Sequence, residues 1–542
     1  GISYIDDFES FENTFSLMQP GSWSLASPPD SVGAVDRAGV IKSFGSDTLR
    51  SQWRAGMGWY QVNASILSEL SNKPVYDVGA IDIVEISEVF PNKDIQAEID
   101  RTLQTFDLYY DPRLRGPYNY TRQLDQFFQR PEETWGGMVQ RLPDGFNDFS
   151  LKNIDFIEFI IRPFPENASG DAGASAKLYV DLGSITEDII PNQRLNNEDG
   201  LSLSTISETS ILDGNRFPTG TQNGVVDIDD ATRRTEDLGL DGLASYAPED
   251  YGIATEQTQF ASFLSYLNQA CVTVSTPLCQ AEVARSQVDP SADDYHYFGN
   301  DRFFDDANFW PGGAATVQQR LTRFFAGHEL NAFEAQNRLA NNTVVKRGNS
   351  RFPDSEDRNL NSTVDLVNSY YQYEVPLSRQ KLDSLAVPTA VDDYVVGEIE
   401  DKDGNGTGWY QVRIPVRQFT RRVGDIQDFS LIESIRVWTT GHEVPITLRF
   451  ATLELVGSQW QKSDRVAQEK DLYESEDTRL TISSVNNEEN SNVYVTPTGT
   501  IISQTRLASG RVQNAREQAM VLRVENLKPG QQRAIYRTYN QG

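Results

Sequence analysis

The pattern of apolar positions along the chain favours short strands over long helices. Residues 154–161 form a run of about eight residues that is rich in β-branched and aromatic side chains and is closed by Arg162 and Pro163. Such a run is too short for a buried helix. A second run, 432–438, leads to Gly441, and the apolar pattern resumes over 446–455. The runs 432–438 and 446–455 predict a β-hairpin around this glycine.

Two short sequences occur twice in the chain. Asp148-Phe-Ser-Leu151 returns as Asp428-Phe-Ser-Leu431, and Gly58-Trp-Tyr-Gln-Val62 returns unchanged as Gly408-Trp-Tyr-Gln-Val412. An identical pentapeptide with a tryptophan is too specific to be coincidence, so we interpret the repeat as one β-module used twice. Both faces of the strands carry apolar residues, as in the inner strands of a sandwich whose outer face is partly covered.

These patterns predict a mainly β protein of more than one domain, because 542 residues exceed one ordinary core. We expect two tandem jelly-roll-like β-sandwich modules over 1–190 and 366–465. An inserted helical and loop region is predicted over 191–365, and a partial third β-module over 466–542.

The insertion is expected to be ordered. Two windows, 256–270 and 317–339, place apolar residues on one helical face. The aromatic residues of the insertion are too many for a disordered linker.

Charge and hydropathy narrow the class of protein. The chain has 78 acidic and 48 basic residues, for a net charge of -30. That charge repels nucleic acids and anionic lipids, so no nucleic-acid partner is expected. No apolar run reaches the ~20 residues of a membrane-spanning helix, and the stretch is expected to be soluble on its own.

The sequence holds only two cysteines, Cys271 and Cys279. Their spacing within a segment of turn character suits a short disulfide loop, which would contribute ~2–3 kcal/mol in an oxidising compartment. Two reduced thiols are the alternative, and the sequence leaves both open.

No catalytic motif is apparent. The chain lacks a nucleophile elbow, a phosphate-binding loop, a Cys-x-x-Cys and a His-Glu-x-x-His motif. His296, His328 and His442 lie in different segments without partners at motif spacing. Carboxylates are so abundant that a glycosidase-like pair cannot be located. We therefore expect a protein that is not an enzyme.

Two loops resemble calcium-binding loops, in which oxygen donors recur at every second position around a hard cation. In the first loop Asn368 stands in place of the closing carboxylate, and in the second Val412 does. The alternative for both is an ordinary Asx-rich turn. The candidate ligands are Asp357, Asn359, Asn361 and Asp365 in the first loop, and Asp401, Asp403 and Asn405 in the second.

Tryptophans offer another candidate site, because jelly-roll modules often bind glycans through exposed aromatic rings. A carbohydrate-binding cell-surface adhesin is therefore the alternative function. Packing in the core is the simpler interpretation for Trp59 and Trp409, which recur in the repeat. The tryptophans in question are Trp23, Trp53, Trp59, Trp135 and Trp409.

Taken together, several stretches resemble the SprA (Sov) family, the outer-membrane translocon of the type IX secretion system of the Bacteroidetes. They keep their order over essentially the whole chain. The stretches are Tyr4-Ile-Asp-Asp-Phe-Glu9, Trp23-Ser-Leu-Ala-Ser27, Arg115-Gly-Pro-Tyr-Asn-Tyr120, Trp135-Gly-Gly-Met138, Ile157-Glu-Phe159 with Pro163-Phe164, Leu178-Tyr-Val-Asp-Leu-Gly183, Thr186-Glu-Asp-Ile189, Asp237-Leu-Gly-Leu-Asp-Gly-Leu243 and Arg449-Phe-Ala-Thr-Leu-Glu-Leu455.

The resemblance implies that the intact protein is a giant single-chain outer-membrane β-barrel, related to gliding motility, through which folded cargo proteins cross. It implies a PorV-like barrel and a plug protein as partners, and attachment to the outer membrane through the rest of the parent chain. The present chain would be a soluble piece on the extracellular side, in the cap over the pore. The family pattern contains no catalytic residues.

Overall fold

The computed structural model describes most of the chain between residues 12 and 536. The described residues are 12–30, 50–61, 83–93, 101–163, 175–198, 224–225, 239–243, 256–273, 276–294, 296, 302–325, 353–385, 395–458, 460–463, 479–488, 494–496, 498, 504–506, 512–514, 517–529 and 533–536. Of the family-like stretches, residues 4–9, 164 and 237–238 lie outside them, as does His328.

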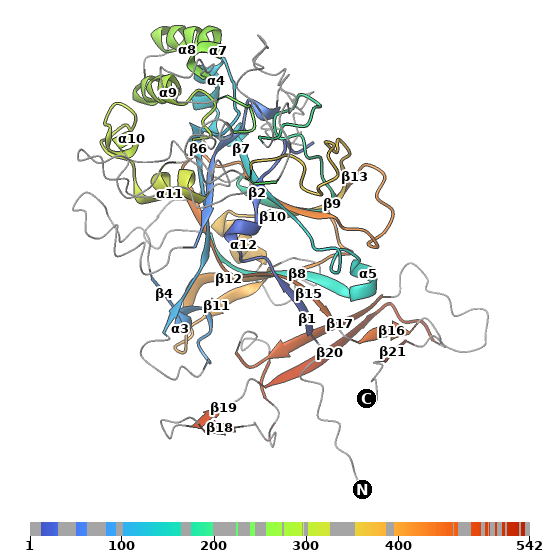
Figure 1. Cartoon of the computed structure of the whole chain (residues 1–542). Helices are drawn as coiled ribbons and strands as arrows, with labels where there is room; N and C mark the ends of the chain where they lie inside the picture. Colours follow the sequence, from blue (N-terminus) through green and yellow to red (C-terminus); the bar gives the residue numbers. More distant parts are fainter. Residues whose placement is uncertain are drawn as a thin grey trace.

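Two antiparallel sheets form the centre of the molecule (Figure 1). The first has the order β11 (Val395–Glu400), β12 (Gly406–Pro415), β8 (Ile154–Arg162), β15 (Ile446–Ser458), β6 (Phe106–Arg115) and β3 (Ala55–Tyr60), and β1 (Glu12–Ser16) also pairs with β15. The second has the order β13 (Arg421–Val423), β10 (Ser369–Pro376), β9 (Lys177–Ser184), β14 (Ser434–Thr440), β7 (Trp135–Arg141) and β2 (Ser24–Leu25). Side chains of both sheets share one apolar core, so the sheets form a sandwich.

The prediction of a mainly β fold is confirmed, but the prediction of two tandem sandwiches is wrong. In the first sheet β8 pairs with β12 on one side and β15 on the other. In the second sheet β9 pairs with β10 and β14. Because β8 and β9 take all of these neighbours from the later stretch, neither stretch can complete a sheet alone. The two predicted modules therefore fold together as one shared sandwich.

The two Asp-Phe-Ser-Leu copies contact each other, and only their phenylalanines, Phe149 and Phe429, belong to the core of the shared sandwich. Asp148 caps the short helix α5 (Phe149–Lys152), since its Oδ1 accepts the Leu151 amide at 2.8 Å. In the second copy the Asp428 Oδ1 accepts the Ser430 amide at 2.9 Å. The Phe149 amide donates to the Phe429 carbonyl at 2.9 Å, which joins the two copies directly.

The hairpin predicted around Gly441 is also wrong, because β14 and β15 belong to different sheets. The chain crosses from one sheet to the other at this glycine, which has φ of +82°. A Cβ on Gly441 would lie 2.2 Å from the Ser175 carbonyl oxygen, so only glycine fits the crossing.

Helices occupy the stretch between β9 and β10, as predicted for the insertion. They are α7 (Glu256–Gln259), α8 (Ala261–Thr273), α9 (Pro277–Val288), α10 (Arg302–Asp305) and α11 (Val317–Phe325). In Figure 1 the first three gather at the top, at one end of the sheets. The apolar face predicted for 256–270 is buried through Phe260, Phe263, Leu264 and Leu267. Of the second predicted window, 317–325 is helical and 326–339 lies outside the described residues.

The repeated glycine of the first pentapeptide has a packing role. At Gly58 an added Cβ would lie 2.5 Å from the Thr322 Cα, because α11 packs directly on β3 there. The insertion therefore contacts the sheet itself and is not an appendage on a linker.

Smaller elements complete the fold. Short helices are η2 (Pro20–Ser22), α3 (Ile86–Val89), α4 (Leu124–Gln129), η5 (Pro131–Glu133) and α12 (Arg379–Leu385), and β4 (Val84–Glu85) pairs with β5 (Thr102–Leu103). After the sandwich, β16 (Gln461–Ser463) pairs with β21 (Ala534–Tyr536), β17 (Arg479–Asn486) with β20 (Gln518–Glu525), and β18 (Gln504–Arg506) with β19 (Val512–Asn514).

A buried ionic cluster ties three strands of the second sheet together. The Asp181 carboxylate on β9 accepts from Arg436 Nε at 2.8 Å and Trp438 Nε1 at 2.9 Å, both on β14. It also accepts from Gln372 Nε2 on β10 at 2.9 Å. Asp181 and Arg436 have no exposed side-chain surface. The cluster thus joins the earlier stretch of the chain to the later one within the core.

We predict that Asp181→Asn lowers the free energy of unfolding of the whole sandwich by about 3 kcal/mol or more, because Arg436 is left as a buried cation without its anion. Denaturant unfolding followed by tryptophan fluorescence measures this loss. The control is Asp144→Asn, which breaks an ion pair to Arg141 at the surface and should cost under about 1 kcal/mol. Equal losses in both variants would contradict the role of the cluster.

Acid should destabilise the sandwich through His442. Burial lowers the pKa of its imidazole to about 3, from 6.5, so the ring stays neutral beside Thr439 and Tyr110. The unfolded chain binds a proton near pH 6.5 and the folded chain does not, so this contribution is fully present above 6.5 and is lost as the pH falls towards 3.

Between pH 6.5 and about 3, we expect protonation of His442 in the unfolded chain to lower the free energy of unfolding by about 1.4 kcal/mol per pH unit. The measurement is the unfolding free energy from pH 7 to pH 4, compared with that of His442→Gln. The variant should show a shallower slope whatever its absolute stability. An unchanged slope would show that His442 does not titrate in this way.

Candidate functional site

The helical insertion meets the sandwich at residues 115–120, one of the family-like stretches. We call this contact region the insertion junction. It consists of residues 115–120, α9, and the loops 239–243 and 289–294. Residues 115–120 and both loops are buried or half-buried, and α9 buries Cys279, Ala281, Glu282, Arg285 and Ser286.

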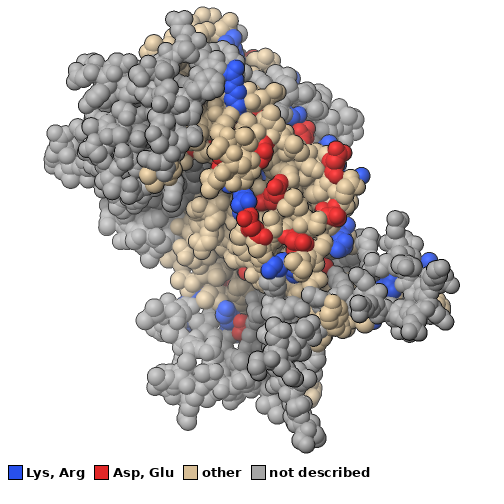
Figure 2. Space-filling model, turned by 45° about the vertical axis from the view of Figure 1, so that its right-hand side comes forward, with Lys and Arg blue, Asp and Glu red and all other residues tan. Residues whose placement is uncertain are grey.

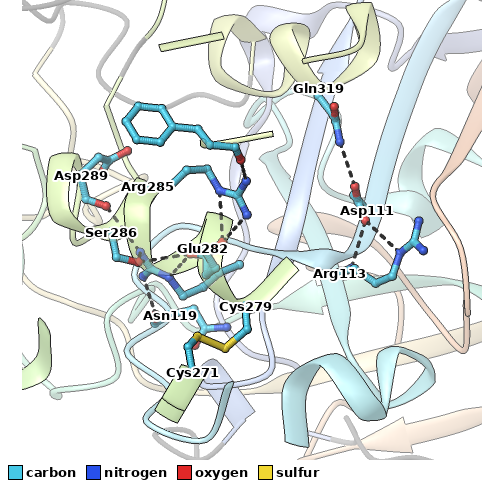
Figure 3. Close-up of polar contacts among 12 residues, drawn as sticks. Asp111, Arg113, Asn119, Cys271, Cys279, Glu282, Arg285, Ser286, Asp289 and Gln319 are labelled. Atoms are coloured by element: carbon cyan, nitrogen blue, oxygen red, sulfur yellow. Dashed lines mark hydrogen bonds and ion pairs between the residues drawn. A yellow bond between two sulfur atoms is a disulfide. The ribbon is translucent and has the colours of Figure 1, made fainter. Parts of the chain in front are cut away.

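An ionic network at the centre of the junction fixes α9 to β6 (Figure 3). Arg115 Nε donates to Glu282 Oε1 at 2.8 Å, and Arg285 Nη2 donates to Glu282 Oε2 at 2.7 Å. All three side chains are at most 5% exposed. Burial alone would raise the pKa of Glu282, but Arg285 and Arg115 hold it below its usual 4.5. Glu282 is therefore a charged carboxylate clamped between two arginines.

Both arginines make further contacts that extend the network. Arg115 donates to the Asn119 carbonyl at 2.7 Å and to Ser286 Oγ at 3.1 Å. Arg285 donates to the Phe309 carbonyl and lies over the Trp310 ring at 4.8 Å. The network thus reaches the cluster of aromatic residues around α10.

The rest of the 115–120 stretch binds the two junction loops. The Tyr118 amide donates to the Ser291 carbonyl at 2.7 Å, and the Tyr118 hydroxyl accepts from the Leu240 amide at 3.2 Å. Tyr120 is hydrogen-bonded through its hydroxyl to Ser291 Oγ at 3.0 Å. The family-like stretch 115–120 therefore meets residues 239–243 of another such stretch at this junction.

The two cysteines form a disulfide in the same region (Figure 3). Cys271 lies on α8 and Cys279 on α9, with 5.7 Å between their Cα atoms. Of the two states left open by the sequence, the structure shows the oxidised one. The bond links α8 to α9, the helix that carries Glu282 and Arg285.

Beside the junction, acidic groups gather in two sets. In the first set, the carboxylates of Asp241, Glu256 and Asp293 offer oxygens within 4.8 Å of one another. In the second set, ligand atoms of Asp289, Asp294 and His296 also lie within 4.8 Å of one another. No sequence motif announces the first set, because its members are spread over more than fifty residues. Only the fold of the insertion brings them together.

The first predicted calcium loop is held by its own hydrogen bonds. Asp357 accepts the Asn361 and Ser362 amides at 2.9 and 2.7 Å. The Asp365 carboxylate accepts from Asn359 Nδ2 at 2.5 Å. The four candidate ligands share one loop, and two of them, Asn359 and Asp365, line a pocket of about 300 Å³. Calcium binding here stays a prediction.

The second predicted loop is smaller, and its residues after Asp401 are exposed. Asp401 Oδ1 accepts the amides of Asp403 and Asn405, both at 2.8 Å, and Asp401 Oδ2 accepts Asn405 Nδ2 at 3.1 Å. This is the hydrogen bonding of an Asx-rich turn, with Gly404 in the left-handed region. Calcium binding at this loop also stays a prediction.

The tryptophans considered as a glycan platform are buried in the molecule. The exposed fraction of these five side chains does not exceed 9%. Their rings fill the core, so they offer no exposed stacking surface. The five are Trp23, Trp53, Trp59, Trp135 and Trp409.

The shared sandwich and its clamped helical insertion define a mainly β scaffold. A family model described as "Motility related/secretion protein", SprA_N, matches residues 265–541. This match covers just over half of the chain, and the chain belongs to that family, so its role is related to motility or secretion. A search of the curated proteins finds no match.

The family match begins inside α8. Its strands β10, β12, β14 and β15 pair with β6, β7, β8 and β9, which precede residue 265. The folded unit is therefore larger than the matched segment, which cannot form the sandwich without the earlier strands.

We predict that Glu282→Gln loosens the insertion junction, because two buried arginines lose their anion, at a cost of about 3 kcal/mol. Relative to the unaltered chain, hydrogen exchange should accelerate more in α9 and α8 than in β9 and β14. Gln287→Ala, an exposed change on the same helix, is the matched control and should leave exchange unchanged. Unaltered protection of α9 in Glu282→Gln would contradict the clamp.

Proposed function

We propose that the chain is an extracellular cap part of a giant outer-membrane β-barrel translocon of the type IX secretion and gliding-motility class. In this proposal it acts without catalysis, as a rigid roof over a wide pore through which folded cargo proteins pass. Its partners would be the cargo, a PorV-like barrel and a plug protein. The rest of the parent chain would hold it at the cell surface.

The observation that carries the proposal is the interleaving of the sandwich. In the middle of both sheets, strands from before and after the insertion are interleaved, so the halves cannot separate without breaking the core. The helices are then clamped onto the sandwich through Glu282. A body built in this way suits a fixed wall rather than a hinged lid.

The disulfide supports a location outside the cytoplasm, because such bonds persist in oxidising compartments. Among the described helices, none is both long and apolar enough to cross a bilayer. On the face in Figure 2, acidic side chains gather on the described surface with basic ones between them. In our proposal this wetted, charged surface limits adhesion to cargo.

A carbohydrate-binding adhesin is the weaker alternative. Its motivation was the set of tryptophans, and these are buried.

The location can be tested by cysteine labelling on intact cells. Leu360 and Val495 are 86% and 84% exposed, so Leu360→Cys and Val495→Cys present reactive thiols. With a membrane-impermeant maleimide, we expect both variants to be labelled without permeabilisation. The unaltered chain is the control, since its two cysteines are in a disulfide. Labelling only after the outer membrane is opened would contradict an extracellular position.

The roof function needs a separate experiment. A parent translocon in which residues 1–542 are replaced by a short linker should either stop secreting cargo or admit small solutes. Both secretion and uptake of a membrane-impermeant antibiotic are measured in cells with matched levels of the barrel. Normal secretion through a barrel that stays sealed would overturn the proposal.

A further inference from the structure

Three carboxylates from separate segments converge beside the insertion junction. Asp241 lies in the loop 239–243, Glu256 begins α7, and Asp293 follows α9. Their oxygens lie within 4.8 Å of one another. Glu256 and Asp293 have no exposed surface. Such a concentration of buried negative charge is costly unless a positive charge or donors compensate for it.

Asp241 accepts from the Leu243 amide at 2.8 Å and from Ser291 Oγ at 2.5 Å, but donors do not satisfy the other two carboxylates. Glu256 Oε2 accepts the Ser291 amide at 3.2 Å, but Glu256 Oε1 is buried without a hydrogen-bond partner. Neither carboxylate oxygen of Asp293 has a hydrogen bond of standard length and angle, although the Tyr118 hydroxyl interacts with this carboxylate. Buried polar atoms in native proteins nearly always have a partner. These oxygens therefore point to a ligand that supplies positive charge.

The surrounding carboxylates also favour a bound cation, because they make each negative charge in the group more costly. Burial and then the charges of Asp293, Asp241, Asp289 and Asp294 raise the pKa of Glu256 well above its usual value. Burial, Asp241, Asp289 and Asp294 also raise the pKa of Asp293, against a smaller lowering by the Tyr118 hydroxyl. Arg115 reaches the neighbouring Asp289 carbonyl at 3.5 Å, but its charge is paired with Glu282 at 2.8 Å.

We propose that Asp241, Glu256 and Asp293 bind a calcium ion. The three carboxylates offer only oxygen ligands, which suit a hard cation better than zinc or copper. Ser291 Oγ lies 2.5 Å from Asp241 Oδ2 and adds an oxygen at the edge of the group. Calcium accepts six to eight oxygens in flexible geometry, whereas magnesium demands a near-ideal octahedron and retains water.

The ion would connect the segments that dock the insertion. The loop 239–243 is bound to Tyr118 through the Leu240 amide, and the loop 289–294 through the Ser291 carbonyl. Glu256 starts the helix that precedes the buried Phe260. A cation between the three carboxylates would therefore fasten both loops and α7 to the sandwich. This inference does not depend on the proposed translocon function.

The test is calcium binding to the whole 542-residue chain after treatment with a chelator. Titration calorimetry with Ca²⁺, and luminescence of Tb³⁺ sensitised by nearby tyrosines, measure occupancy. We expect Glu256→Gln and Asp293→Asn each to weaken binding by about tenfold or more. Asp357→Asn and Asp401→Asn test the two predicted loops, and Asp144→Asn, an exposed carboxylate outside every candidate site, is the matched control; binding at the junction should persist in all three.

Thermal unfolding separates loss of the site from loss of the fold. Calcium should raise the melting temperature of the unaltered chain and of both loop variants. Asp293→Asn should melt no lower than the calcium-free parent, because it removes buried negative charge, and it should not respond to calcium. Absence of calcium binding would overturn the inference. So would binding that is lost in the loop variants and kept in Glu256→Gln and Asp293→Asn, or a response to zinc alone.

Discussion

The fold depends on the buried charge pair between Asp181 and Arg436. It lies in the middle of the second sheet and bonds β9 to β14, while Gln372 extends the contact to β10. Two charges without solvent are stable only together, so β9 has one acceptable register against its later partners. The pair thus specifies how segments more than 250 residues apart assemble.

A second buried ionic contact, made by three residues, repeats this principle at the insertion. Glu282 holds Arg115 on β6 and Arg285 on its own helix, and the disulfide keeps α8 beside α9. Packing of Phe260, Phe263 and their neighbours buries apolar surface area, and the ionic contacts determine where the helices lie on the sandwich. The molecule can therefore carry a large helical insertion without becoming two mobile bodies.

The elements of this fold could be predicted from the sequence better than their arrangement. Residues 154–161 form a strand, and 256–270 form helices with the expected face, because period and length are local properties. The repeat was correctly located but misinterpreted as two sandwiches, since pairing between β8 and β15 is not encoded in either run alone. The turn at Gly441 looked like a hairpin because a sequence does not show which sheet the next strand joins.

The contacts of the insertion junction could not be predicted from the sequence for the same reason. Arg115 and Glu282 are 167 residues apart, and the carboxylates of Asp241, Glu256 and Asp293 have no motif spacing. The predicted calcium loops were found because their oxygen donors are close in sequence, and closeness in sequence also produces Asx turns. Family-like stretches such as 115–120 marked the right place without revealing the contacts.

Hydrogen exchange measured by mass spectrometry on the whole chain tests the shared sandwich most directly. If the two stretches form one core, amides of β8, β9, β14 and β15 should open together, with the same free energy and the same sensitivity to denaturant. Separate opening of β8 with β9 and of β14 with β15, at different denaturant concentrations, would contradict the shared core and restore two independent modules.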